Sequence, residues 1–130
     1  MNPVTKPRSP NTPDEAPPSS IAVIVADDQA VARLGTCQLL QEAPEIEVEA
    51  TAASQSEALR LIRAHHPDLL VTEAKLPDGL GTEIPIQLRA SEVQTDVLIL
   101  SAYRQQAYLQ SFLEAGAAGY LLKEDDCRLL

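Results

Sequence analysis

The chain has 130 residues and a formal net charge of −9. This length suits one domain with a single core, because domains cluster near roughly 100–150 residues. An acidic surface repels phosphate groups and the sequence has no Lys/Arg cluster, so we expect neither nucleic acid nor an anionic membrane as a direct partner. No apolar run approaches the roughly 18 residues of a membrane span. We therefore expect a soluble, cytoplasmic protein whose partners are other proteins.

Residues 1–19 differ in composition from the rest of the chain. They hold six of the ten prolines and only one branched apolar residue, Val4. Such a segment buries too little apolar surface to offset the entropy lost on ordering. We predict a disordered, Pro-rich tail at residues 1–19 and one folded domain at residues 20–130. The two cysteines, Cys37 and Cys127, have no metal-ligand spacing and no secretory leader before them, which indicates free thiols.

Five segments have the pattern of strands. Most are short apolar runs, typical of strands buried on both faces of a parallel sheet. One segment, IEVEATA, alternates apolar and acidic residues instead, which favours a place near the sheet edge. The predicted strands are residues 21–26, 46–52, 68–73, 96–101 and 117–123.

Helical patterns separate these strands. Ser54 and Glu57 form a predicted capping box, whereas Thr82 is expected to cap the third helix, with Pro85 in its first turn. Pro44 is expected to close off the first helix. The apolar or helix-lining positions are Val31, Leu34, Leu39 and Leu40 in the first helix, Ala58, Leu61, Ile62 and His65 in the second, and Tyr108, Phe112 and Leu113 in the fourth.

Strands that alternate with helices pair in parallel through right-handed crossovers. We predict an α/β fold of the flavodoxin-like type, a doubly wound five-stranded parallel sheet in (βα)5 order with its last helix truncated or missing. Only seven residues follow Lys123, fewer than the roughly 11–12 of an average helix. Either the chain is cut from a longer protein, or an exposed apolar face favours dimerisation.

Polar side chains gather where the predicted strands end. The carboxyl ends of parallel strands meet at one rim, which brings together Asp27, Asp28, Glu73, Ser101 and Lys123. Carboxylates suit Mg²⁺, while a lysine and a hydroxyl can hold phosphoryl oxygens. The pattern indicates phosphoryl transfer to a carboxylate.

The segment after Glu73 is a predicted turn, LPDGLG, at residues 76–81. Its glycines, Gly79 and Gly81, are permissive of positive φ angles. Lys75 lies on the same side as Glu73 and could pair with the acidic cluster in place of a metal. A solvated turn residue is the alternative for Lys75.

The order VADD, then a strand-end acid followed by LP and a glycine turn, then LILSAY and EAGAAGYLLK, resembles the receiver domain of two-component response regulators. The last segment is similar to the NarL/LuxR branch, whose members carry a helix-turn-helix output domain. The resemblance covers residues 20–125. It implies a metal-binding pair at Asp27 and Asp28, a switch hydroxyl at Ser101, a rotating aromatic at Tyr120 and a phosphate-sensing lysine at Lys123.

Glu73 departs from that family, which has an aspartate phospho-acceptor at this position. Neither Asp68 nor Asp78 can substitute without a register slip. The extra methylene moves the carboxylate by about 1.3–1.5 Å, and misplacement on the 1 Å scale can slow an in-line reaction by about 10²-fold. Two hypotheses stay open: Glu73 imitates a phospho-aspartate by reaching Lys123 or Ser101, or the site is inert.

The sequence therefore favours an atypical receiver, a protein-interaction or dimerisation module in signal transduction and transcription regulation. Phosphorylation and Mg²⁺ binding are expected to be weak or absent. The resemblance implies a histidine kinase or an output domain as partner, a homodimer, and a lost helix-turn-helix domain that would bind DNA. The alternative function is a working phospho-acceptor that takes a phosphoryl group from a histidine kinase. An enzyme is not expected, because no Gly-rich phosphate loop and no nucleophile–base pair occur.

Simpler explanations exist for several of these residues. Asp28 could be only the N-cap of the first helix, an explanation that does not extend to Asp27. Tyr120 could be an ordinary packed side chain. Tyr103 and Tyr108 fit either partner contact or packing. The two histidines at residues 65–66 are expected at the carboxyl end of the second helix, where the helix dipole favours a cation.

Overall fold

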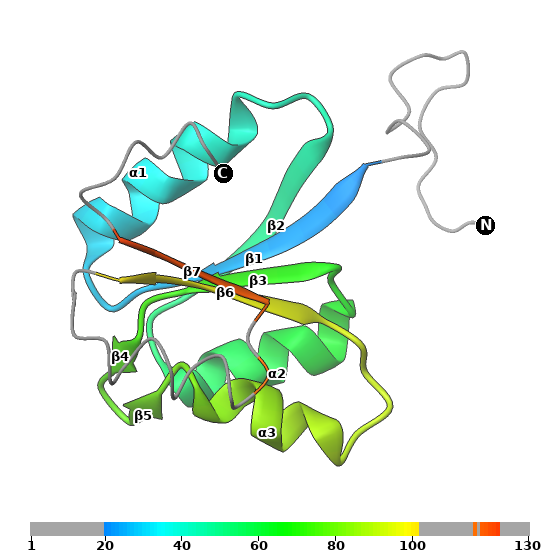
Figure 1. Cartoon of the computed structure of the whole chain (residues 1–130). Helices are drawn as coiled ribbons and strands as arrows, with labels where there is room; N and C mark the ends of the chain where they lie inside the picture. Colours follow the sequence, from blue (N-terminus) through cyan, green and yellow to red (C-terminus); the bar gives the residue numbers. More distant parts are fainter. Residues whose placement is uncertain (1–19, 102–115, 117, 123–130) are drawn as a thin grey trace.

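The computed structural model describes residues 20–101, 116 and 118–122, and Figure 1 draws the rest as a grey trace. Its elements are β1 Ile21–Ala26, α1 Ala30–Gln41, β2 Ile46–Ala52, α2 Gln55–His65, β3 Leu69–Thr72, β4 Lys75–Leu76, β5 Gly79–Leu80, α3 Glu83–Arg89, β6 Asp96–Ser101 and β7 Gly119–Leu122. The expected tail at residues 1–19, the expected fourth helix and Cys127 lie outside the described residues.

The main sheet has five strands in the order β2-β1-β3-β6-β7, and every pair is parallel. Figure 1 shows α1 on one face of this sheet and α2 and α3 on the other. This arrangement confirms the predicted doubly wound α/β fold. It also confirms that the alternating segment, β2, is an edge strand.

The central strand β1 shows why its sequence is a continuous apolar run. Val23 and Val25 point toward α1, whereas Ile24 and Ala26 join the core beneath α2 and α3. All four are at most 1% exposed. Because both faces are covered by helices, no position in the inner part of the strand is left for a polar residue.

Helix α1 packs on the sheet through Cys37 and Leu40. Burial raises the pKa of the Cys37 thiol, which is free as predicted. Val31 and Leu34 point outward instead, with exposed fractions of 86% and 62%. Their apolar character therefore does not mark the face of α1 that contacts the core.

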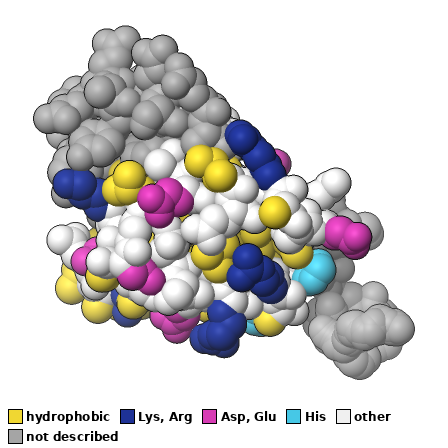
Figure 2. Space-filling view, turned by 90° about the horizontal axis from the view of Figure 1, so that it is seen from below, with side chains coloured by type: hydrophobic (Ala, Val, Ile, Leu, Met, Phe, Trp, Pro, Cys, Tyr) yellow, Lys and Arg dark blue, Asp and Glu magenta, His cyan; other side chains and the backbone are white. Residues whose placement is uncertain are grey.

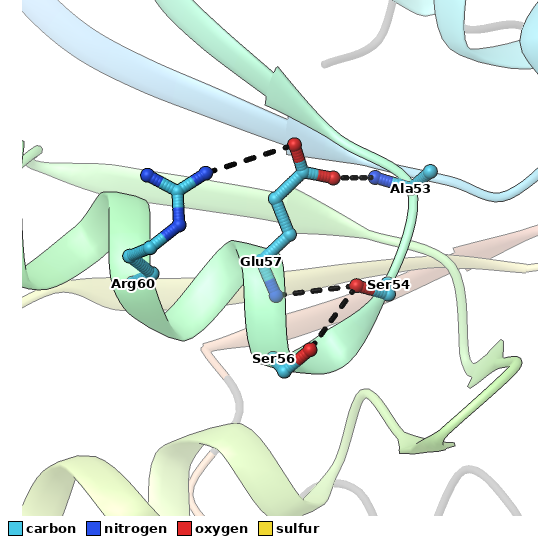
Figure 3. Close-up of polar contacts among 5 residues, drawn as sticks. All are labelled: Ala53, Ser54, Ser56, Glu57 and Arg60. Carbon is cyan, nitrogen blue, oxygen red and sulfur yellow. Dashed lines mark hydrogen bonds and ion pairs between the residues drawn. The ribbon is translucent and has the colours of Figure 1, made fainter.

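The start of α2 is held by the predicted capping box (Figure 3). Ser54 Oγ accepts a hydrogen bond of 3.2 Å from the Glu57 N–H. Glu57 Oε1 accepts one of 2.9 Å from the N–H of Ala53, the residue before the cap. These bonds satisfy two backbone donors at the helix entry.

The carboxyl end of α2 carries the two histidines. His66 ends the helix in the left-handed conformation, with φ 50°. His65 Nδ1 lies 3.5 Å from Glu49 Oε1 of the edge strand β2. The His65 side chain therefore contacts a neighbouring strand as well as lying at the negative end of the helix dipole.

Ser54→Ala is expected to lower the free energy of unfolding by about 1 kcal/mol, because the Glu57 N–H loses its acceptor. Urea denaturation monitored by circular dichroism measures the change. Ser56→Ala is the matched control: Ser56 is exposed, its hydroxyl contacts the Ser54 hydroxyl at 3.4 Å, and we expect a much smaller loss. Equal losses for the two variants would contradict the capping role of Ser54.

Candidate functional site

The ends of β1 and β3 place two acidic residues side by side. The Glu73 N–H donates to the Ala26 carbonyl oxygen at 2.9 Å, and the Asp27 N–H donates to Ala52 at 2.9 Å. Ser101 ends β6 and pairs with Leu122 of β7. The backbone therefore brings these chain positions to one rim of the sheet, as the sequence analysis expected.

The Glu73 side chain lies inside this rim. Its exposed fraction is 7%, and its Oε2 accepts a hydrogen bond of 2.6 Å from the N–H of Ala74. A charge-assisted bond of this length is among the stronger hydrogen bonds in proteins. One carboxylate oxygen of Glu73 is therefore engaged by its own chain neighbour.

Three other residues of the predicted site are not described in full. Lys123 lies outside the described residues, and the side chains of Ser101 and Tyr120 do too. The roles expected for these residues, and the imitation of a phospho-aspartate by Glu73, stay predictions.

Asp27 and Asp28, the acidic pair that follows β1, have different surroundings. Asp27 is 4% exposed, and its Oδ1 accepts a 2.9 Å hydrogen bond from the Gln29 N–H. Its carbonyl oxygen accepts from Arg33 Nη1 at 2.6 Å. The residue that caps α1 is Gln29, with no side-chain hydrogen bond, so the N-cap explanation for Asp28 is wrong. The helix begins one residue later than that explanation required, Asp28 is exposed, and Asp27 is the residue that satisfies a backbone donor here.

Metal binding at this rim is expected from the sequence to be weak or absent. Within residues 20–101, 116 and 118–122, no three His, Cys, Asp or Glu side chains are close enough together to hold one. Asp27 and Glu73 each direct a carboxylate oxygen at a backbone N–H. Mg²⁺ takes several oxygen ligands in near-octahedral geometry, and the described residues supply no group of three such side chains. The weak or absent Mg²⁺ binding expected at Asp27 and Asp28 stays a prediction.

The chain after Glu73 forms a small hairpin, in which β4 pairs antiparallel with β5. The glycines of this turn are needed for space rather than for positive φ, since Gly116 is the one described glycine with positive φ. A Cβ on Gly79 would lie 2.5 Å from Gln55 Nε2. A Cβ on Gly81 would lie 2.5 Å from the Glu73 carbonyl oxygen. Lys75 is exposed in β4, and both explanations of it remain open.

Thr82 does not cap α3 through its side chain, contrary to the prediction. It occupies the N-cap position, but with φ −66° and ψ −18° its backbone is helical and its hydroxyl makes no capping bond. A capping side chain requires an extended backbone to turn back on the helix. Among the described residues the buried Oγ1 of Thr82 has no hydrogen-bond partner.

Asp78 is a residue that the sequence analysis missed. Its Oδ1 accepts from the Gln55 N–H at 2.7 Å, and its Oδ2 accepts from the Ser56 N–H at 3.0 Å. These hydrogen bonds, that from Ser56 first, lower the pKa of the Asp78 carboxyl. Asp78 thus ties the hairpin to the first turn of α2, a helix that begins 23 residues earlier in the chain.

The face covered by α2 and α3 is shown in Figure 2. On its described surface, Lys and Arg side chains stand in small separate groups, with acidic and apolar side chains between them. This face therefore lacks the continuous basic stripe typical of nucleic-acid binding. None of the described helices is long and apolar enough to cross a membrane.

The contribution of Asp78 to stability should depend on pH. Its folded pKa is lowered, so the contribution is complete above the unfolded pKa, near ~3.9, and is lost as the pH falls through the folded pKa. The difference in unfolding free energy between wild type and Asp78→Asn is expected to be constant at neutral pH and to shrink below about pH 4. Urea denaturation at a series of pH values measures it. A difference that grows as the pH falls would contradict the hydrogen bonds assigned to Asp78.

Comparison with known proteins finds a matching family and relatives of this chain. The family model described as "Response regulator receiver domain" matches residues 23–130. The chain is 37% identical over 102 residues to the oxygen regulatory protein NreC of Staphylococcus haemolyticus, which covers 78% of this chain and 47% of NreC. It is 35% identical over 104 residues to the transcriptional regulatory protein LnrK of Bacillus subtilis, with coverage of 80% and 48%. The chain thus spans about half the length of the curated relatives it matches.

Solved structures of response regulators are also similar to this chain. The signal receiver domain of NarL from Mycobacterium tuberculosis superposes with a TM-score of 0.80 at 33% identity, covering 84% of this chain and 88% of that domain. A two-component response regulator of the LuxR family from Aurantimonas superposes with a TM-score of 0.79 at 32% identity, covering 83% and 77%.

Proposed function

Because the chain belongs to the response-regulator receiver domain family, we propose that it is an atypical receiver whose signalling state does not depend on phosphorylation. It would act as a protein-interaction or dimerisation module in signal transduction and transcription regulation. One observation carries the proposal. At the end of β3 stands Glu73, 7% exposed, with its Oε2 held by the Ala74 N–H at 2.6 Å.

This arrangement opposes phosphoryl transfer in two ways. An attacking oxygen must reach the phosphorus in line, within a near-attack distance of roughly 3–3.5 Å. The Glu73 carboxylate is buried and one of its oxygens is already bound to a backbone donor. Its longer side chain also places the carboxylate about 1.3–1.5 Å from where an aspartate would hold it.

The same carboxylate stands at the rim where the family carries its phospho-acceptor. A glutamate carries a single charge and two oxygens, against a charge of about −1.5 to −2 and three acceptor oxygens for a phosphoryl group. Partial imitation of a phospho-aspartate and an inert site are both compatible with a phosphorylation-independent receiver. In either case Mg²⁺ binding is weak or absent, and the chain has no enzymatic activity of its own.

The partners follow from the family and from charge. The relatives are named regulatory proteins, and the matched part of this chain spans about half of their length. We infer a cytoplasmic protein with protein partners, a histidine kinase or an output domain, and with a tendency to form homodimers. A helix-turn-helix domain in a longer form of the protein would bind DNA. The net charge of −9 opposes DNA binding by this domain itself.

A working phospho-acceptor is the second candidate. It is favoured by the position of Asp27 and Glu73 on adjacent strand ends, joined through the hydrogen bond between the Glu73 N–H and Ala26. In this alternative a histidine kinase donates the phosphoryl group to the Glu73 carboxylate.

Intact-mass spectrometry after incubation with Mg²⁺ and acetyl phosphate separates the two candidates. We expect no phosphoryl adduct on the wild type, because the Glu73 carboxylate is displaced and engaged. We expect an adduct on Glu73→Asp, because the shorter side chain restores the acceptor geometry that the family uses.

Glu73→Gln is the matched control. It keeps the length of the side chain but replaces the nucleophilic carboxylate with a neutral amide. It should carry no adduct. A phosphoryl adduct on the wild type that is absent from Glu73→Gln would overturn the phosphorylation-independent function.

A further inference from the structure

Four residues fasten the β4–β5 hairpin to the start of α2. We call this set the hairpin clamp; its members are Gln55, Asp78, Leu80 and Glu83. The Asp78 carboxylate accepts the first two N–H groups of α2, at 2.7 and 3.0 Å. Gln55 Nε2 donates in the opposite direction, to the Leu80 carbonyl oxygen at 3.0 Å and to Glu83 Oε1 at 2.7 Å. Contacts that run in both directions fix the hairpin on α2 more firmly than a single helix cap would.

Gly79 packs against the side chain of Gln55 in the hairpin clamp. The Gln55 side chain is buried, 8% exposed, and occupies the space where a Cβ on Gly79 would lie. The closest approach would be 2.5 Å, to Gln55 Nε2. Steric fit and hydrogen bonding therefore select the same position of the hairpin.

The base of the hairpin rests directly on Glu73. The Gly81 N–H donates to the Ala74 carbonyl oxygen at 2.8 Å and closes the hairpin. Gly81 also lies so close to the Glu73 carbonyl oxygen that a Cβ would approach it to 2.5 Å. The peptide unit between Glu73 and Ala74 donates the N–H that holds the Glu73 carboxylate. Its orientation therefore depends on where the hairpin lies.

We propose that Asp78 is a positioning residue for Glu73: by fastening the hairpin to α2, it fixes the peptide whose N–H holds the Glu73 carboxylate. The inference rests on the proposed function, in which this carboxylate sets a permanent state of the rim. Asp78 acts on Glu73 through the hairpin. Without Asp78, the hairpin can shift, and the hydrogen bond between Glu73 and Ala74 weakens.

Nuclear magnetic resonance tests this proposal on the full chain. The amide of Ala74 and the side-chain carboxyl carbon of Glu73 report directly on their hydrogen bond. In Asp78→Ala we expect both resonances to move and the Ala74 amide to exchange with solvent roughly tenfold faster or more, because the peptide that carries this N–H is no longer held in place. Asp78→Asn, which keeps one acceptor oxygen, should restore part of the wild-type signature.

Ser54→Ala is the matched control, because it removes the other cap of α2 and leaves the hairpin contacts intact. It should leave the Ala74 amide and the Glu73 carboxyl unchanged. If Asp78 were only a helix cap, Ser54→Ala and Asp78→Ala would affect these two groups equally, and the proposal would be overturned.

Gly79→Ala provides a second variant should Asp78→Ala fail to fold, since the new methyl group displaces Gln55 from the hairpin. It is expected to give the same shifts, and unchanged Ala74 and Glu73 signals in a folded Gly79→Ala would also overturn the proposal. The readout uses no phosphodonor. A phosphoryl adduct on the wild type would therefore refute the proposed function alone, and an unchanged Ala74 amide would refute the positioning role of Asp78 alone.

Discussion

The structure of the rim depends on one backbone interaction, the hydrogen bond from the Glu73 N–H to the Ala26 carbonyl oxygen. It continues the parallel ladder between β1 and β3 by one residue past their ends. Because these strands are buried on both faces, their register is strongly specified. The two acidic residues that follow, Asp27 and Glu73, therefore have no freedom to separate. Their chemistry is decided by side-chain length and by local donors.

Those local donors come from the backbone. The Gln29 N–H donates to Asp27 and the Ala74 N–H donates to Glu73, so one oxygen of each carboxylate accepts a hydrogen bond from within two residues of its own position. The hairpin after Glu73 is in turn held against α2 through Asp78. Buried polar groups that are fully hydrogen-bonded tend to specify a single arrangement. These contacts support the proposal that the rim holds one state, independent of a transferred phosphoryl group.

The sequence predicted the sheet, its edge strand and the capping box of α2, because hydrophobic period and capping residues are local signals. It did not predict the roles of Asp78, Gly79 or Gly81. Each depends on a contact with a residue from another element, and no local pattern encodes such a contact. The N-cap explanation for Asp28 is wrong because α1 begins one residue later than that explanation required. Helix boundaries are only weakly encoded in a sequence. The placement of Glu73 at a strand end followed from the sequence, whereas its bond to Ala74 did not.

The most direct test of a phosphorylation-independent rim is to add beryllofluoride with Mg²⁺, a mimic of the phosphoryl group, and to record the backbone amide spectrum. The account predicts that the amides of Ala74 and Gly81 in the wild type keep their positions at saturating beryllofluoride. Shifts of these amides that saturate with beryllofluoride would show that the rim still accepts a phosphoryl-like group, and would contradict the account.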